Sequence, residues 1–318
     1  MWRYLVRRVI VSLPVLFLVS ALTFIGTLML PGDELTTFYG AEIDASVTDE
    51  QLDALRHEYG LDRPVPVRYF RWLGDLLQGD LGTSLRAKEP VADLMRQKLS
   101  VSIWFASITL GFNLISGVTL GVVAGLNPGG KIDLAATTIA TWGVATPNFW
   151  IAILLILLFS LTLGWFPAAG WVSPLENPLE ALRYMTLPIL ALGLFGSASI
   201  MRQTRSAFVE VMSQDYIRTA RAKGVMQRDV VIRHALRNAL IPIITLAAFQ
   251  VAGLVSGSVL VERVFAIPGI GRLAVDATTA RDYPVIQGIV MMSATAIVVA
   301  NLLADLAYGI VDPRIRYR

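Results

Sequence analysis

Six long stretches without any charged side chain constrain this chain more than any other feature of its sequence. They occupy residues 9–30, 101–126, 134–166, 184–201, 238–261 and 285–304. An α-helix needs about 20 consecutive apolar residues to cross the hydrocarbon core of a bilayer. Charged residues make up only 16% of the chain, against about 25% in an average soluble domain. The pattern predicts an all-α, polytopic membrane protein with six transmembrane helices.

Three of the six stretches depart from a simple crossing. The stretch at 134–166 is longer than one crossing requires, so we expect Pro147 to kink it or to mark its beginning. The stretch at 184–201 is short and contains Pro188, which a helix packed among others in lipid tolerates. The stretch at 9–30 is too long for a typical signal-peptide core, and no small-x-small cleavage site follows it. We therefore expect the first stretch to be a retained helix.

The distribution of Lys and Arg predicts the orientation of the chain. With six crossings both termini lie on one side, and that side receives fifteen of the 27 basic residues, including eight between Arg202 and Arg237. Eight of the other twelve fall in the long segment after the first helix, beside thirteen acidic residues. Basic residues mark the cytoplasmic side, and long translocated segments follow this rule weakly. We expect both termini to be cytoplasmic.

The crossings divide the chain into five regions. Residues 1–30 hold the N-terminus and first helix, 31–99 an extracytoplasmic insert, 100–201 the second to fourth helices, 202–238 a cytoplasmic loop, and 239–318 the last two helices and C-terminus. In the insert, a capping-box pattern at 48–51 predicts a short helix. A second helix is expected at 67–77, with Phe70, Leu73 and Leu77 facing inward. The insert is predicted to be either a structural lid or a docking surface or gate.

The cytoplasmic loop carries two amphipathic helical patterns joined at Gly224. The second pattern is a row of Ile232, Leu236 and Leu240 that leads into the next crossing. An exposed apolar stripe in the first pattern requires a protein partner or the bilayer surface to cover it. A basic loop can also do no more than fix topology or lie on anionic lipid, so these interpretations stay open. The stripe consists of Val209, Met212, Tyr216, Ile217 and Ala220.

Residue types suited to catalysis or metal binding are scarce. The chain has no cysteine, and His57 and His234 are too far apart in sequence to propose a metal site. Polar residues inside the crossings are pathway candidates by default, although neutral amides commonly join helices and Asp305 could pair with a terminal arginine. At the outer end of the fifth crossing, Glu262 and Arg263 predict an interfacial salt bridge or a gate. The pathway candidates are Asn113, Gln250, Asn301 and Asp305.

Short motifs along nearly the whole chain resemble one transporter family. The run DYIRTARAKG at 215–224 resembles the EAA loop of ABC importer permeases, and HALRNALIP at 234–242 resembles its version in the dipeptide/oligopeptide permease family. Arg218-Thr219-Ala220 stands where many importers have Glu-Ala-Ala, a variant common in the peptide subfamily. The long insert after the first helix is similar to that of the first, B-type, permease subunit. Further resemblances are RYLVRRVIVSLPVLFLVS near the start, PGD at 31–33, GDLGTS at 79–84, FAIPGIGRLAVDA at 265–277, RDYPVIQG at 281–288 and DPRIRY at 312–317.

The resemblance implies a permease subunit of an ATP-driven importer of di- or oligopeptides in the prokaryotic inner membrane. It implies a second, related permease subunit, two cytosolic ATPase subunits, an extracytoplasmic substrate-binding protein and membrane lipid as partners, and no nucleic acid. The pattern GxxxxGK[ST] is absent, so this chain is expected to be no enzyme and to bind no cofactor, with ATP used by the partner subunits. The loop at 202–238 would couple the permease to the ATPase through Asp215, Tyr216, Thr219, Ala220, Lys223 and Gly224.

Alternatives within and outside this class stay open. Related permeases carry nickel complexes, glutathione or oligosaccharides, and the sequence does not separate these cargoes. A secondary transporter should show an internal repeat or carboxylates at mid-membrane, and neither is apparent. A membrane-embedded enzyme would need a catalytic constellation inside the crossings, and no His, Cys or paired acid lies there. The sequence also leaves open whether the second permease subunit is identical to this chain or different from it.

Overall fold

The computed structural model describes residues 2–29, 54, 57, 62–255 and 259–311, and within that part the chain is helical with no β-strand. The predicted short helix near 48–59 therefore lies outside the described residues. The long helices are α1 (Trp2–Leu28), α5 (Val91–Leu126), α8 (Pro178–Met212) and α15 (Tyr283–Val311). The remaining segments in the membrane region are α6 (Lys131–Ala145), α7 (Asn148–Leu155), the π-helix η2 (Ile156–Thr162) and α12 (Ile241–Val255).

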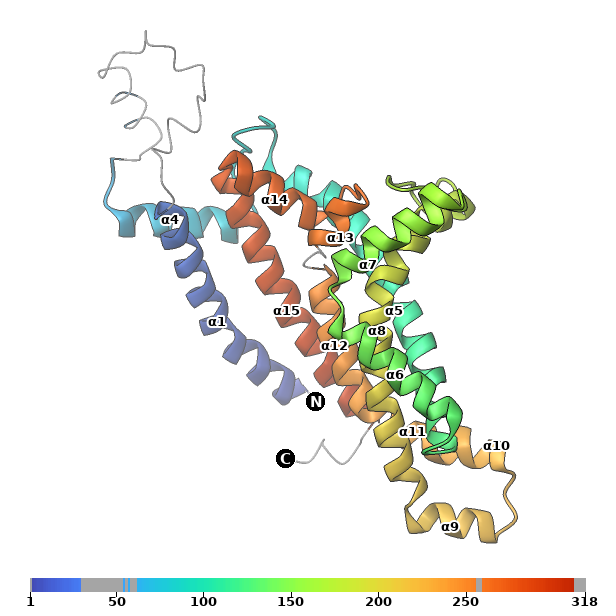
Figure 1. The fold of residues 1–318 in the computed structure, drawn as a ribbon. Coiled ribbons are helices and arrows are strands. Elements are labelled where there is room, and N and C mark those ends of the chain that lie inside the picture. Colours follow the sequence, from blue (N-terminus) through green and yellow to red (C-terminus); the bar gives the residue numbers. More distant parts are fainter. Residues whose placement is uncertain (1, 30–53, 55–56, 58–61, 256–258, 312–318) are drawn as a thin grey trace.

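Short helices lie at the two ends of this bundle (Figure 1). At one end are α4 (Val65–Leu77), α13 (Val259–Val264) and α14 (Ile270–Ala280). At the other are α9 (Asp215–Ala222), α10 (Gln227–Asp229) and α11 (Arg237–Ala239), with the π-helix η3 (Val230–Leu236) between the last two. The two groups are separated along the long axis by the membrane-region helices.

Four described helices are long and apolar enough to cross a bilayer, and two bent pairs bring the number to six if each pair is one crossing. The first pair is Lys131–Ala145 with Asn148–Thr162, bent by 105°, and the second is Gln227–Ala239 with Ile241–Val251, bent by 54°. Between the halves of the first pair stands Pro147, which has no N–H to continue the helical ladder. The predicted kink at Pro147 is confirmed.

The boundaries of two predicted crossings are wrong. The fourth, expected at 184–201, is part of the 35-residue helix α8, and the second begins at Val91 rather than at residue 101. A search for uncharged runs ends each segment at its first charged residue, here Arg202 and Lys98. A helix does not have to end there, because its backbone continues into water once the apolar part has crossed. The region boundaries at 100 and 201 therefore fall inside helices α5 and α8.

Helices α5 and α8 pack through a row of glycines. Gly117, Gly121 and Gly125 recur every four residues along α5 and are all buried. A Cβ atom on Gly121 would lie 2.6 Å from the Cβ atom of Thr204 and 2.7 Å from the carbonyl oxygen of Met201. A Cβ atom on Gly117 or Gly125 would likewise come within 3.0 Å of α8. The row allows the two backbones to approach closely, as small-xxx-small patterns do between helices in lipid.

The predicted helix at 67–77 is confirmed as α4, and of the three residues predicted to face inward Leu73 is half-buried while the other two are exposed. Phe70 is 62% exposed and Leu77 is 80% exposed. Tyr69 is buried instead: its ring packs edge-on against Phe24 of α1, and its hydroxyl lies 2.8 Å from the hydroxyl of Ser20. An amphipathic helix beside a membrane-spanning helix can leave its apolar face to lipid, so spacing alone does not identify the face that packs on protein.

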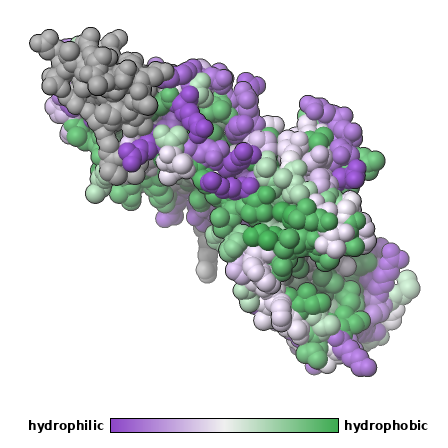
Figure 2. Space-filling view, turned by 45° about the horizontal axis from the view of Figure 1, so that its top comes forward, coloured by the Kyte–Doolittle hydropathy of each residue, from purple (hydrophilic) through white to green (hydrophobic). Residues whose placement is uncertain are grey.

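The surface of the bundle fits a membrane environment. Residues of α1 such as Ile10, Val11 and Leu22 are each more than half exposed. Figure 2 shows apolar side chains gathered over the middle of the molecule, with hydrophilic residues towards its ends. Apolar surface of this extent is costly in water and is covered by lipid or by neighbouring helices in a membrane. The chain is therefore a polytopic, all-α membrane protein.

Candidate functional site

Helix α9 projects beyond the membrane region at the end of α8 (Figure 1). Two residues, Ser213 and Gln214, separate α8 from α9. The helix stops in a defined C-terminal turn: the N–H of Gly224 donates to the carbonyl of Arg221 at 3.0 Å, and the N–H of Val225 donates to that of Ala220 at 3.2 Å. This is the hydrogen-bond pattern of a Schellman motif, which requires a left-handed residue. Gly224, where the two predicted helical patterns meet, supplies it with φ of +77°.

The chain itself covers part of the predicted apolar stripe, whereas Tyr216 of the same stripe is 42% exposed. Ile217 and Ala220 are buried in a cluster with residues from the end of α8 and from the returning segment. The full set of buried members is Phe208, Ile217, Ala220, Val230, Ala235 and Ala239. Periodicity identified the buried face correctly but not what buries it. The cluster fixes α9 on a rigid base.

The returning segment packs through a different face from the predicted one. Ile232 is 50% exposed, whereas Val230, Ala235 and Ala239 are fully buried. Residues 230–236 form the π-helix η3, in which residues five apart share a face. The predicted row of Ile232, Leu236 and Leu240 assumed α-helical spacing of four. An inserted π-turn shifts the phase, which explains the error.

The outer face of α9 is polar and accessible. Asp215, Arg218, Thr219, Arg221 and Lys223 are exposed. Tyr216 is 42% exposed, and its hydroxyl accepts a hydrogen bond of 2.9 Å from the side-chain amide of Asn238. Five of the six predicted contact residues thus lie on accessible surface, while Ala220 lies on the inner face. Met226, 72% exposed just after Gly224, is an apolar contact candidate that sequence reasoning missed.

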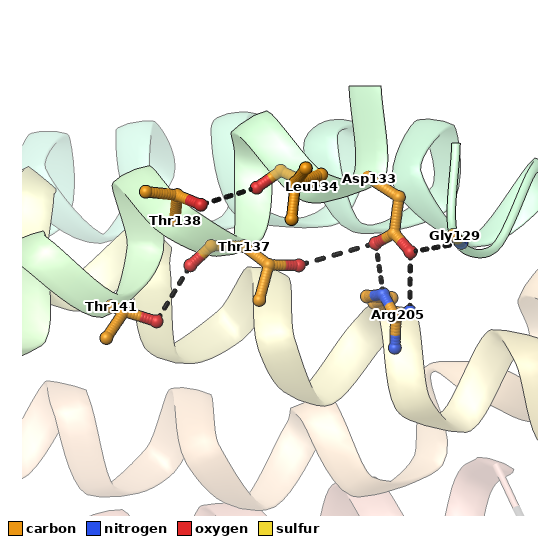
Figure 3. Close-up of polar contacts among 7 residues, drawn as sticks. All are labelled: Gly129, Asp133, Leu134, Thr137, Thr138, Thr141 and Arg205. Carbon is orange, nitrogen blue, oxygen red and sulfur yellow. Dashed lines mark hydrogen bonds and ion pairs between the residues drawn. The ribbon is translucent and has the colours of Figure 1, made fainter. Parts of the chain in front are cut away.

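A buried ion pair lies between α6 and α8, near the α9 end (Figure 3). Asp133 Oδ2 accepts 2.6 Å from Arg205 Nη2 and 2.8 Å from the N–H of Gly129. Its other oxygen accepts from Arg205 Nε and, at 3.3 Å, from the hydroxyl of Thr137. The Asp133 side chain is 5% exposed and that of Arg205 32% exposed. The two residues are 72 positions apart, so no local pattern could pair them.

Two of the four pathway candidates meet in the structure. Asn113 Nδ2 of α5 donates to Gln250 Oε1 of α12 at 3.0 Å, and Gln250 Nε2 donates to the carbonyl of Gly196 in α8 at 2.9 Å. The side chains thus join three helices, as the helix-packing interpretation predicts. They also line a cavity of about 460 Å³ whose wall includes Asn148, Ser199 and Phe249. The same residues can therefore pack helices and face a polar solute.

Of the other two pathway candidates, Asn301 does not line this cavity, and the structure does not describe the side chain of Asp305. Asn301 is exposed on α15 and is not among the lining residues. Asp305 belongs to α15, but its side chain lies outside the described residues. A pathway role for these two stays a prediction.

The amide pair allows a direct measurement of its contribution to stability. In a double-mutant cycle with Asn113→Ala and Gln250→Ala, we expect a coupling energy of about 0.5–2 kcal/mol, the range for hydrogen bonds between membrane helices. The cycle is measured by reversible denaturation in mixed micelles. A second cycle, between Asn113→Ala and Asn301→Ala, is expected to show no coupling. Equal coupling in the two cycles would contradict the observed contact.

Glu262 does not form the predicted salt bridge with Arg263. Its side chain is fully buried, and Oε2 accepts a hydrogen bond of 3.0 Å from the N–H of Arg272 in the first turn of α14. Ser102 Oγ accepts 2.9 Å from the neighbouring N–H of Ile270. Unpaired N–H groups at a helix start attract a carboxylate. Glu262 therefore fixes the beginning of α14, and Arg263 is exposed.

Comparisons with known proteins show the family of this chain. The chain matches the binding-protein-dependent transport system inner membrane component family over residues 117–317 and that family's N-terminal region over residues 1–106. It is 39% identical over 318 residues to the oligopeptide transport system permease protein AppB of Bacillus subtilis, covering 99% of each chain. A Brucella abortus protein named for a peptide transport system permease is 41% identical over 313 residues, covering 98% of each.

Two further relatives extend the comparison. The glutathione transport system permease protein GsiC of Escherichia coli is 38% identical over 318 residues, covering all of each chain. Among solved structures, an inward-facing MetNI methionine ABC transporter shares the fold, with a TM-score of 0.54 and 18% identity over 69% of this chain and 96% of that one. The chain belongs to the binding-protein-dependent transport system inner membrane component family.

Proposed function

We propose that this chain is the membrane-spanning permease subunit of an ATP-driven peptide importer, with α9 as its contact to a cytosolic ATPase subunit. The observation that carries the proposal is the construction of α9. Its apolar face is fixed on the chain's own cluster and its charged face is accessible at the tip of a continuous helix. A helix held this firmly can transmit a displacement of a bound partner into the membrane region.

The orientation follows from the same construction. The end that carries α9 also carries the densest group of basic residues, eight between Arg202 and Arg237. Basic residues near helix ends favour the cytoplasmic side. With six crossings, we propose that both termini lie in the cytoplasm of a prokaryote, where ATP is available to the partner subunits.

The cavity beside Gln250 supports a peptide as cargo. Its polar lining side chains are the neutral amides of Asn113, Asn148 and Gln250 and the hydroxyl of Ser199, and the rest of its wall is largely apolar. Amides can donate to and accept from a peptide backbone without selecting a side-chain charge. The relatives named for oligopeptide, peptide and glutathione transport favour the same class of cargo.

The proposal requires partners that this chain does not supply. We infer a complex with a second, related permease subunit, two ATPase subunits and an extracytoplasmic substrate-binding protein. The sequence holds no GxxxxGK[ST] pattern, so ATP hydrolysis is assigned to the ATPase subunits and no cofactor to this chain. The accessible face of α9 is the surface assigned to the ATPase subunit.

Charge reversal on α9 tests the proposal. We expect Arg221→Glu to reduce recovery of the ATPase subunits with the tagged permease by at least about fivefold, because the substitution reverses the charge that α9 presents to its partner. Peptide-stimulated ATP hydrolysis in proteoliposomes should fall in parallel.

Arg183→Glu is the matched control, since Arg183 is exposed at the opposite end of α8. It should leave recovery of the ATPase subunits unchanged. If no ATPase subunit is recovered even with the wild-type chain, the importer assignment fails. Peptide uptake driven by an ion gradient without ATP would then favour a secondary transporter.

A further inference from the structure

We propose that Asp133 and Arg205 form a clasp that makes α6 move with α9, so that ATPase-driven movement of α9 reaches the wall of the Gln250 cavity. The inference rests on the proposed function and adds positioning residues to it. The clasp consists of the ion pair together with the Gly129 and Thr137 donors to the same carboxylate (Figure 3).

The position of Arg205 ties the clasp to α9. Arg205 lies seven residues before Met212, the last residue of α8, which corresponds to about 10 Å of helix. No break interrupts α8 over these residues. Three residues after Arg205, Phe208 enters the cluster that seats Ile217 and Ala220. The guanidinium is therefore on the same rigid segment as the base of α9.

The position of Asp133 ties the clasp to the beginning of α6. Asp133 is the third residue of α6, and its carboxylate also receives the N–H of Gly129 in the preceding turn. The apolar contacts of α6 with α8 in this half use small side chains on α6, with Ala136 and Ala140 near Ala198 and Met201. Small contacts slide more easily than interlocked large ones, so a bidentate pair of fixed geometry is the directional link here.

Helix α6 connects the clasp to the cavity. It ends at Ala145, and after the bend at Pro147 the first residue of α7 is Asn148, which lines the Gln250 cavity. A movement of α6 together with α8 and α9 would therefore change the position of Asn148 relative to Gln250 of α12. This gives a continuous physical route from α9 through α8, Arg205, Asp133 and α6 to the cavity.

Distances between spin labels test the clasp without any change to it. The chain contains no cysteine, so cysteines introduced at Ile139 on α6 and Ala222 on α9 are unique labelling sites in this subunit. Both residues are exposed. In the assembled complex we expect the same label-to-label distance without nucleotide and with ATP plus vanadate, because the clasp moves α6 with α9. A clear change in this distance in the unmodified pair overturns the proposal.

Variants of the clasp supply the functional arm. Arg205→Gln and Asp133→Asn should lower the amount of peptide transported per ATP hydrolysed by at least about fivefold, while recovery of the ATPase subunits with the permease stays unchanged. In the same variants the Ile139-to-Ala222 label distance should become dependent on nucleotide. A pair that contributes only to stability would lower yield or melting temperature and leave both quantities as in the wild type, which overturns the proposal.

The matched control is Thr141→Val on the same helix, whose exposed hydroxyl donates to the backbone carbonyl of Thr137 and not to Asp133. It should retain wild-type transport per ATP. If clasp variants fail to accumulate, the wild-type distance measurement still decides the proposal. If the wild-type chain recovers no ATPase subunit, the proposed function fails first, and the role of the clasp fails with it.

Discussion

Gly121→Val is expected to lower the yield and the melting temperature of the folded chain, the largest effect expected of a single substitution in the membrane region. Its Cβ atom would lie 2.6 Å from the Cβ atom of Thr204 and 2.7 Å from the backbone oxygen of Met201. Neither neighbour is the free end of a flexible side chain, so α5 and α8 must separate. Overpacking of this kind costs about 1–3 kcal/mol and sometimes more, a large share of the total stability of about 5–15 kcal/mol.

The measurement is the amount and melting temperature of tagged chain in detergent extracts, followed by fluorescence-detected size exclusion. Gly111→Val is the matched control: it lies on the same helix, and a Cβ atom there has no neighbour within 4 Å. Both variants replace glycine with the same β-branched residue, so they share the change in helix propensity. Equal melting temperatures for the two variants would contradict the close approach of α5 and α8.

Features determined by local chemistry were predictable from the sequence. The apolar stretches predicted the crossings, Pro147 predicted the bend because it cannot donate a backbone hydrogen bond, and Gly224 predicted where α9 ends. The glycine row on α5 is also visible in the sequence as G-x-x-x-G-x-x-x-G. That spacing is a recognised signal for close helix packing and would have identified the α5–α8 pair.

Features determined by tertiary packing were not predictable in the same way. The π-turns of η3 change which residues share a face, and no sequence signal in residues 230–236 predicts them. The residues that bury Ile217 include some that lie up to 22 positions later in the chain. The periodicity of apolar residues within α9 cannot reveal them. Asp133 and Arg205 are both charged residues at crossing ends, where solvation is the ordinary expectation. Their pairing follows only from the way α6 packs beside α8.

Gly224→Val is expected to separate the permease from its ATPase subunits, the largest effect expected outside the membrane region. Gly224 has φ of +77°, and nothing lies within 4 Å of a Cβ atom placed there. The effect therefore arises from backbone strain alone, about 1–2 kcal/mol for a side chain in left-handed conformation. Relief of that strain unwinds the end of α9 and moves Lys223 and Met226, both on the accessible surface. One to two kcal/mol corresponds to a loss of about 5–30-fold in ATPase recovery.

Two controls separate conformation from general damage. Gly224→Asn should keep most of the ATPase recovery, because asparagine tolerates left-handed backbone better than valine. Gly164→Val introduces comparable strain, at φ of +66° with no neighbour within 4 Å, in the turn after η2, outside the α9 segment. It should cost the chain similar stability and leave recovery of the ATPase subunits unchanged. If Gly224→Asn and Gly224→Val reduce recovery of the ATPase subunits equally, the glycine is needed because its backbone lies close to the partner, and not because of its φ. The contact surface would then include the Gly224 backbone itself.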